Sequence, residues 1–65
     1  MLYRNNKNGK LYTYLTTCIN ATNSSDGQEM ILYAKDDLLF VREKQEFFKK
    51  FTLWIEEWYE ILFFR

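Results

Sequence analysis

The chain has 65 residues, 20% of them aromatic, and its nine basic residues balance nine acidic ones, so its formal net charge is zero. This length allows one domain, and the lack of a basic excess argues against a long DNA or RNA partner. Cys18 is the single cysteine and histidine is absent, which excludes an internal disulfide and a thiolate zinc site. Association is therefore what we expect to stabilise so small a core.

Turn signals divide the first forty-odd residues into four short strands. Asn8-Gly9 favours a hairpin turn, since both residues adopt positive φ readily. A polar loop, "TNSSDGQ", and a tight turn, "KDD", separate the later segments, which are rich in the aromatic and aliphatic residues typical of strands. The expected strands are Leu2 to Arg4, Lys10 to Ala21, Glu29 to Ala34 and Leu38 to Arg42.

The longest expected strand has two different faces. Its alternation places Leu11, Leu15 and Ile19 on one face, and Tyr12, Tyr14 and Cys18 on the other. The runs "MILY" and "LLFV" do not alternate, which predicts that both faces of those strands are covered. Consecutive hairpins of this length indicate an antiparallel meander that could curl into a partial barrel.

After residue 42 the apolar spacing becomes helical. Apolar residues recur at intervals of three and four, at Phe47, Phe51, Trp54, Trp58 and Leu62. In the closing stretch "FTLWIEEWYEILFFR", helical periodicity gathers three glutamates on the opposite face, at Glu56, Glu57 and Glu60. As a strand, the same stretch would place Glu57 among apolar side chains, so we expect a helix. The expected fold is a single α+β domain, with an antiparallel β-meander of about four strands over 1–42 and a mainly helical, amphipathic C-terminal tail over 43–65.

Several short motifs in the first fifty residues occur in a recognisable order. They are an aromatic-basic opening and a Lys-Gly turn in "YRNNKNGKLYTYL", then "EMILY", and then "LFVRE" followed by a phenylalanine pair. This pattern resembles a small bacterial and phage family known only as a domain of unknown function. The matching positions are Tyr3 and Arg4, Gly9 to Tyr12, Glu29 to Tyr33, Leu39 to Arg42, and Phe47 with Phe48.

The resemblance implies a sheet-rich core and a phage or mobile-element setting, and it brings no activity and no catalytic residue. The loop "NATNSSDGQ" is similar to the form found in phage-borne relatives. Glu43 stands where many members have proline, and the tail from Thr52 onward has no counterpart in the family pattern.

The sequence does not indicate catalysis. Without histidine, acid–base chemistry would fall to Asp, Glu, Lys or Tyr, and the adjacent pair Asp36-Asp37 in "AKDDLL" is better explained as a solvated turn. Cys18 has no histidine to activate its thiol, and we expect it to be buried and inert. We therefore expect no enzymatic activity, no metal and no cofactor.

Basic residues are interleaved with tyrosines in the expected strands. A lysine or arginine beside an aromatic ring suits a nucleotide, because the cation pairs with phosphate and the ring stacks on the base. Ordinary strand composition explains the same pattern, so both interpretations stay open. Arg42 is the best candidate because it ends a strand within the family-like motif, and the other candidate ligand-binding residues are Arg4, Lys10, Tyr12 and Tyr14.

The apolar arc of the expected helix is too broad for a small sheet to cover alone. Its glutamate face disfavours a membrane surface, which amphipathic helices approach through Lys and Arg. A second copy of the chain is the simplest partner, and packing against the chain's own sheet is the alternative. The expected oligomer interface comprises Trp54, Trp58, Ile61 and Leu62.

Together these features predict a non-enzymatic, homo-oligomeric phage-type accessory protein. Its expected role is to counteract host defence by sequestering a small nucleotide-like signal. The opening "MLYRNNKNGK" lacks the features of a signal peptide, so a cytoplasmic location is expected, in the host cell if a phage encodes the chain. The alternatives are an inhibitor that docks on a host protein and a small nucleic-acid-binding barrel.

Overall fold

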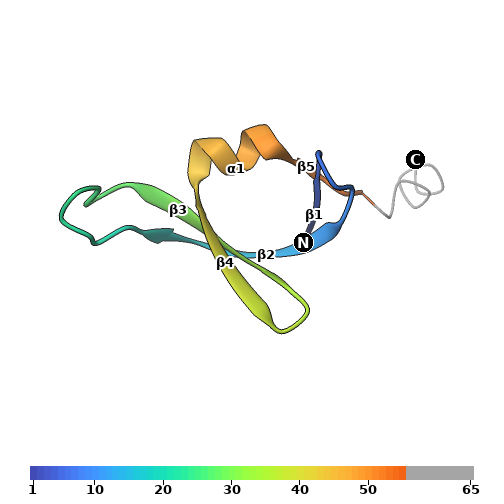
Figure 1. Ribbon diagram of the computed structural model, residues 1–65, viewed down its shortest axis with the longest axis horizontal. Coiled ribbons are helices and arrows are strands. Elements are labelled where there is room, and N and C mark those ends of the chain that lie inside the picture. The colour runs from blue at the N-terminus through green and yellow to red at the C-terminus, as the bar shows by residue number, and fades with distance from the viewer. Residues whose placement is uncertain (56–65) are drawn as a thin grey trace, which may run out of the picture.

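The computed structural model describes residues 1–55, which form one five-stranded antiparallel sheet and one short helix (Figure 1). The expected antiparallel meander of four strands is confirmed, in a fold that is mostly β with one short helix, and a fifth strand is added to it. The elements are β1 (Leu2–Asn5), β2 (Leu11–Ile19), β3 (Glu29–Lys35), β4 (Leu38–Glu43), α1 (Lys44–Lys50) and β5 (Phe51–Leu53).

The sheet combines a meander with a return of the chain to its first strand. The strand order is β4-β3-β2-β1-β5, and all four neighbouring pairs are antiparallel. β4 and β5 are therefore the two edges of the sheet, and α1 connects them across one face (Figure 1). We call the face under α1 the inner face and the opposite one the outer face.

Asparagines build the β1–β2 turn. Asn5 donates its backbone N–H to the carbonyl of Lys10 at 2.9 Å, and its side-chain oxygen accepts from the N–H groups of Lys7 and Asn8 at 2.8 and 3.2 Å. Gly9 is the turn residue with positive φ, at +74°. The hairpin predicted from Asn8-Gly9 is thus present, but its turn spans residues 6–9 because the Asn5 side chain stabilises a longer loop.

A β-bulge in β2 changes which residues face the core. Tyr14 lies opposite Tyr33 and Thr16 lies opposite Leu32, so Leu15 between them has no partner on β3. One unpaired residue reverses the alternation, because successive side chains point to opposite faces. The predicted alternation is therefore wrong beyond Tyr14: the described structure places Leu11 and Ile19 on different faces.

The core is small and mostly aromatic. Its buried residues are Ile31, Tyr33, Phe47 and Phe51, and the half-buried rings packed against them are Tyr3, Tyr12, Tyr14 and Phe40. Phe47 and Phe51 stack with ring centroids 4.4 Å apart, and both rings also contact Tyr33 at 5.1 and 5.2 Å. Phe47 thereby fixes α1 to the inner face.

The outer face carries apolar side chains that residues 1–55 leave exposed. On β4, Leu39 is 67% exposed and Val41 is 58% exposed. They lie opposite Ala34 and Leu32 of β3, on the face away from the buried Tyr33. The prediction that "LLFV" is covered on both sides is therefore wrong for the described residues. On the same face Cys18 lies opposite Met30, and it is half-buried rather than fully buried.

The helix is much shorter than predicted. Its first turn is capped by Glu43, whose carboxylate accepts from the N–H groups of Gln45 and Glu46 at 3.0 and 3.1 Å. It ends at Lys50, and Phe51 is already extended, with φ −126° and ψ 147°. The prediction of a helical tail is wrong for Phe51–Leu53, because these residues pair with β1 instead of continuing the helical hydrogen bonds.

The rest of the predicted helical tail, residues 56–65, lies outside the described residues. Within residues 1–55, no helix has the length and apolarity that a membrane crossing requires.

The structure of the core predicts that two neighbouring phenylalanines differ strongly in their contribution to stability. Phe47 is fully buried, whereas Phe48 is 46% exposed. Phe47→Ala should lower the free energy of unfolding by about 3–5 kcal/mol, because it leaves a cavity beneath the helix, and Phe48→Ala should cost clearly less. Urea unfolding followed by circular dichroism measures both. Equal losses would show that α1 is not held through Phe47.

Candidate anion-binding site

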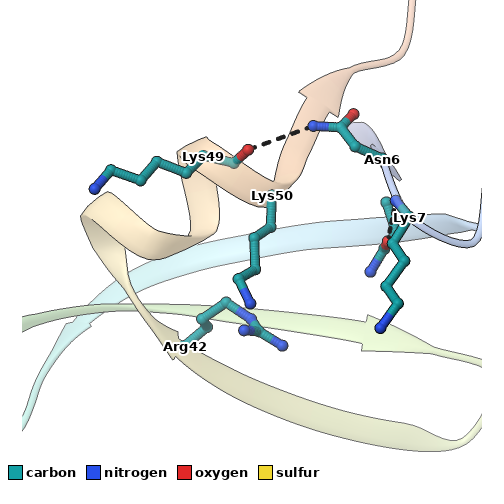
Figure 2. A pocket seen from close by; sticks show the side chains of 6 residues that line it. Asn6, Lys7, Arg42, Lys49 and Lys50 are labelled. Carbon is teal, nitrogen blue, oxygen red and sulfur yellow. Dashed lines mark hydrogen bonds between the residues drawn. The ribbon is translucent and has the colours of Figure 1, made fainter.

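A basic pocket lies where three separate segments meet. It has a volume of about 540 Å³ and is lined by Asn5, Asn6, Lys7, Arg42, Lys49 and Lys50 (Figure 2). The asparagines and Lys7 come from the end of β1 and the turn after it, Arg42 from the end of β4, and the other two lysines from the last turn of α1. The pocket therefore depends on contacts between residues far apart in the sequence.

Arg42 is held at the pocket by several contacts. It lies opposite the buried Ile31, which places it on the inner face. Its Nε donates to the hydroxyl of Tyr33 at 3.3 Å, and its guanidinium carbon lies 5.9 Å from the ring centroid of Phe51. The hydrogen bond to Tyr33 is the main influence that raises the pKa of Arg42 above its ordinary value, and the ion pair with Glu46 adds to it. Arg42 is thus a fixed cation.

Lys49 and Lys50 occupy the last helical turn, where positive charge complements the helix dipole. Figure 2 shows the Lys50 side chain extending toward Arg42, while the ammonium of Lys49 points away from it. Lys50 Nζ lies 3.7 Å from Oε1 of Glu46, the same oxygen that binds Nη1 of Arg42. One carboxylate therefore bridges the two cations.

The turn that carries Lys7 is tied directly to the end of the helix. The backbone N–H of Asn6 donates to the carbonyl of Lys50 at 2.9 Å, and its side-chain amide reaches the carbonyl of Lys49 at 3.5 Å (Figure 2). The Oδ1 atom of Asn6 accepts from the hydroxyl of Thr52 at 2.7 Å. These bonds bring Lys7 to the side of the pocket opposite the helix and satisfy two carbonyls of the helix end.

The charges leave a local positive excess. Lys7, Arg42 and Lys50 approach the pocket, and Glu46 neutralises about one of these charges. A phosphate monoester carries a charge of about −1.5 to −2 at pH 7, which matches the remaining excess. The zero net charge of the chain conceals this, because three of its nine acidic residues are Glu56, Glu57 and Glu60, outside the described residues.

Of the ligand-binding residues predicted from the sequence, Arg42 is the one that lines this pocket. Tyr12 and Tyr14 pack in the core instead: Tyr12 contacts Phe51 with ring centroids 5.4 Å apart, and Tyr14 contacts Phe47 at 6.1 Å. The two other candidates, Arg4 and Lys10, do not line it.

Sequence reasoning missed the asparagines of the turn and three of the four cations. Their signal is the cluster "NNKN" together with a lysine pair at the end of a helix, but only the β1–β5 pairing brings these segments together. Of the predicted oligomer interface, Trp54 directly follows β5 and is 39% exposed. The other three residues, Trp58, Ile61 and Leu62, lie outside the described residues.

In residues 1–55, no group of three or more His, Cys, Asp or Glu side chains is placed to hold a metal ion. Comparison with protein-family models, curated proteins and solved structures finds no match to this chain. The resemblance to the domain-of-unknown-function family therefore stays a prediction.

Because the carboxylate of Glu46 bridges two cations of the pocket, we expect its removal to increase the affinity for anions. Glu46→Gln should strengthen binding of inorganic pyrophosphate several-fold, because it removes a negative charge that competes for Arg42 and Lys50. Glu29→Gln is the matched control, since Glu29 pairs with Lys44 at 3.2 Å and does not line the pocket. Isothermal titration calorimetry at low salt measures the affinities. Equal effects of the two substitutions would mean that Glu46 does not compete with the anion.

Proposed function

We propose that this protein is a non-enzymatic binding protein that takes a small phosphate-bearing, nucleotide-like ligand in the basic pocket. The observation that carries this proposal is that Lys7, Arg42 and Lys50 line one pocket, while the single carboxylate of Glu46 pairs with both Arg42 and Lys50. Charged donors bind phosphate oxygens through charge-assisted hydrogen bonds, and arginine can bind two oxygens at once.

A small ligand suits this pocket better than a long nucleic acid. The volume of about 540 Å³ lies within the range of about 300–1,000 Å³ that is common for small-molecule sites. A duplex would need cations spread along a surface, whereas outside the pocket Lys35 pairs with Asp36 and Lys44 pairs with Glu29. The pocket gathers charge at one place, which supports a compact anion.

The family resemblance suggests where such binding would be useful. It implies a phage or mobile-element setting, and a small protein without catalytic groups would act there by holding a molecule rather than by changing it. We therefore propose that the protein counteracts host defence in the host cytoplasm by sequestering a nucleotide-like signal. Docking on a host protein and binding nucleic acid are the competing functions.

Removing the arginine tests the pocket. Arg42→Ala should weaken binding of pyrophosphate and of a nucleoside diphosphate by about 1.5–3 kcal/mol, because a charge-assisted hydrogen bond is lost. Lys50→Ala should weaken both ligands as well, and its exposed side chain makes an effect on folding small. Lys35→Ala is the control, since Lys35 pairs with Asp36 in the β3–β4 turn. Calorimetry measures the affinities.

Three results would contradict the proposal. Wild-type protein that binds neither ligand at millimolar concentration would remove the function. Binding that neither Arg42→Ala nor Lys50→Ala weakens would place the site elsewhere. Tight binding to random duplex in 150 mM salt, about physiological ionic strength, would favour the nucleic-acid-binding barrel.

We also propose that the chain associates with a second copy of itself. The supporting observation is that strand β4, whose outer edge no other strand of residues 1–55 pairs with, also carries the exposed side chains of Leu39 and Val41. An edge strand can pair antiparallel with the same strand of another copy, and a net charge of zero provides no repulsion between copies. Association would also shelter outer-face residues that residues 1–55 leave exposed.

Light scattering at micromolar concentration tests the association. The wild type should show a mass well above 8.0 kDa, and Val41→Lys should lower it, because a charge is placed in the paired edge. Ile19→Lys is the control, since Ile19 is also exposed, at 61%, but lies at the end of β2. Trp58→Ala with Leu62→Ala tests the interface predicted from the sequence. A wild-type mass of 8.0 kDa would contradict both interfaces.

A further inference from the structure

The side chains that line the basic pocket offer hydrogen-bond donors to a ligand. Its three lysines and Arg42 have donors and no acceptor. Its two asparagines each have a side-chain oxygen, but both oxygens already accept hydrogen bonds. The oxygen of Asn5 accepts from two backbone N–H groups of the turn, and that of Asn6 accepts from the hydroxyl of Thr52. A ligand in the pocket therefore meets N–H groups on every lining side chain.

Asn5 adds a neutral donor whose direction is set by the turn. Its Oδ1 accepts from the N–H groups of Lys7 and Asn8 at 2.8 and 3.2 Å, so Nδ2 is the end of the amide that is left to donate. Within residues 1–55, Nδ2 has no hydrogen-bond partner. Asn5 lies opposite Phe51 of the core, which places it on the inner face together with Arg42. The turn thus presents a free donor on the same face as the guanidinium.

We infer that the pocket binds a terminal phosphate in its doubly ionised form, in preference to a phosphodiester, and that Asn5 donates to it. A dianionic monoester has three acceptor oxygens and no proton to donate, which matches a pocket lined by donors. A diester has fewer free oxygens and a single charge. This inference rests on the proposed function and narrows its ligand to nucleotides that end in a phosphate.

The local charge favours the same ligand. Lys7, Arg42 and Lys50 line the pocket, and the carboxylate of Glu46 neutralises about one of their charges. Beside a cation at about 4 Å in a water-exposed site, one further negative charge on the ligand increases the affinity about five-fold. The monoester carries that further charge and the diester does not.

The ligand should determine how binding depends on pH. The chain has no histidine, the side chain that ordinarily titrates near neutrality. The second ionisation of a phosphate monoester has a pKa of about 6, so the dianion is nearly all of the ligand at about pH 7.5 and about a quarter of it at about pH 5.5. Protonation of Glu46 would have the opposite effect, because it would release Arg42 and Lys50 for the anion.

Two nucleotides that share a base and a sugar test the preference. AMP ends in a phosphate monoester, whereas 3′,5′-cyclic AMP holds its phosphate as a diester. At about pH 7.5 the wild type should bind AMP at least about five-fold more tightly. At about pH 5.5 the affinity for AMP should fall about four-fold, and that for cyclic AMP should stay unchanged. Glu46→Gln should keep this fall. Calorimetry on the full chain measures these affinities.

Asn5→Asp tests the donor without removing the turn. Aspartate still accepts from the N–H groups of the turn, but it replaces Nδ2 by a carboxylate oxygen. The affinity for AMP should fall at least about ten-fold, because a donor is lost and a negative charge is added. Asn8→Asp is the matched control: it adds the same charge to the same turn, and Asn8 binds the N–H of Lys10 at 2.8 Å and does not line the pocket. It should change the affinity much less, and circular dichroism should show both variants folded.

The failures of the two proposals are distinguishable. If AMP and cyclic AMP bind equally and Arg42→Ala weakens both, the preference for a terminal phosphate is wrong and the proposed function stands. If Asn5→Asp and Asn8→Asp have equal effects, Asn5 does not donate to the ligand. An affinity for AMP that rises at about pH 5.5 would assign the pH dependence to Glu46 and contradict the inference. If AMP, cyclic AMP and pyrophosphate all fail to bind, the proposed function fails as well.

Discussion

The pairing of β5 with β1 is the constraint on which the rest of the structure depends. Phe51–Leu53 follow the helix directly and pair with the first strand, and this pairing fixes where α1 ends. The stacking of Phe47 on Phe51 couples the two elements, since one ring belongs to the helix and the other to the strand. Beside this pairing, Asn6 of the turn bonds to Lys50 at the end of the helix, and both residues line the basic pocket.

The first four strands could be predicted because their signals are local. Gly9 and the Asp36-Asp37 pair mark turns through their own backbone preferences, and the flanking segments have strand composition. The end of the helix could not be predicted in this way. Phe51 fits the helical period, and it also fits a strand with one buried face. Its pairing with β1 decides between helix and strand, and β1 is distant in the sequence. The bulge at Leu15 likewise has no local signal.

The candidate site was predictable only in part for a related reason. Arg42 could be found because it ends a strand within the family-like motif. Tyr12 and Tyr14 looked equally suitable for a ligand. Residues 1–55 have four buried residues, however, and the half-buried rings are needed to complete this small core. The charge of the pocket could not be found from composition, because Lys7 and Lys50 line the same pocket only after folding.

The pairing of β5 with β1 also affects how fast the protein folds. Tyr3 pairs with Leu53, so the closing contacts join residues fifty positions apart in a chain of 65. Such pairings give a high contact order, which is typical of domains that fold in milliseconds to seconds rather than microseconds. During synthesis the hairpins of β2, β3 and β4 can form while β1 still has an open edge. The basic pocket, whose lysines at the helix end adjoin β5, can then be complete only once β5 has paired with β1.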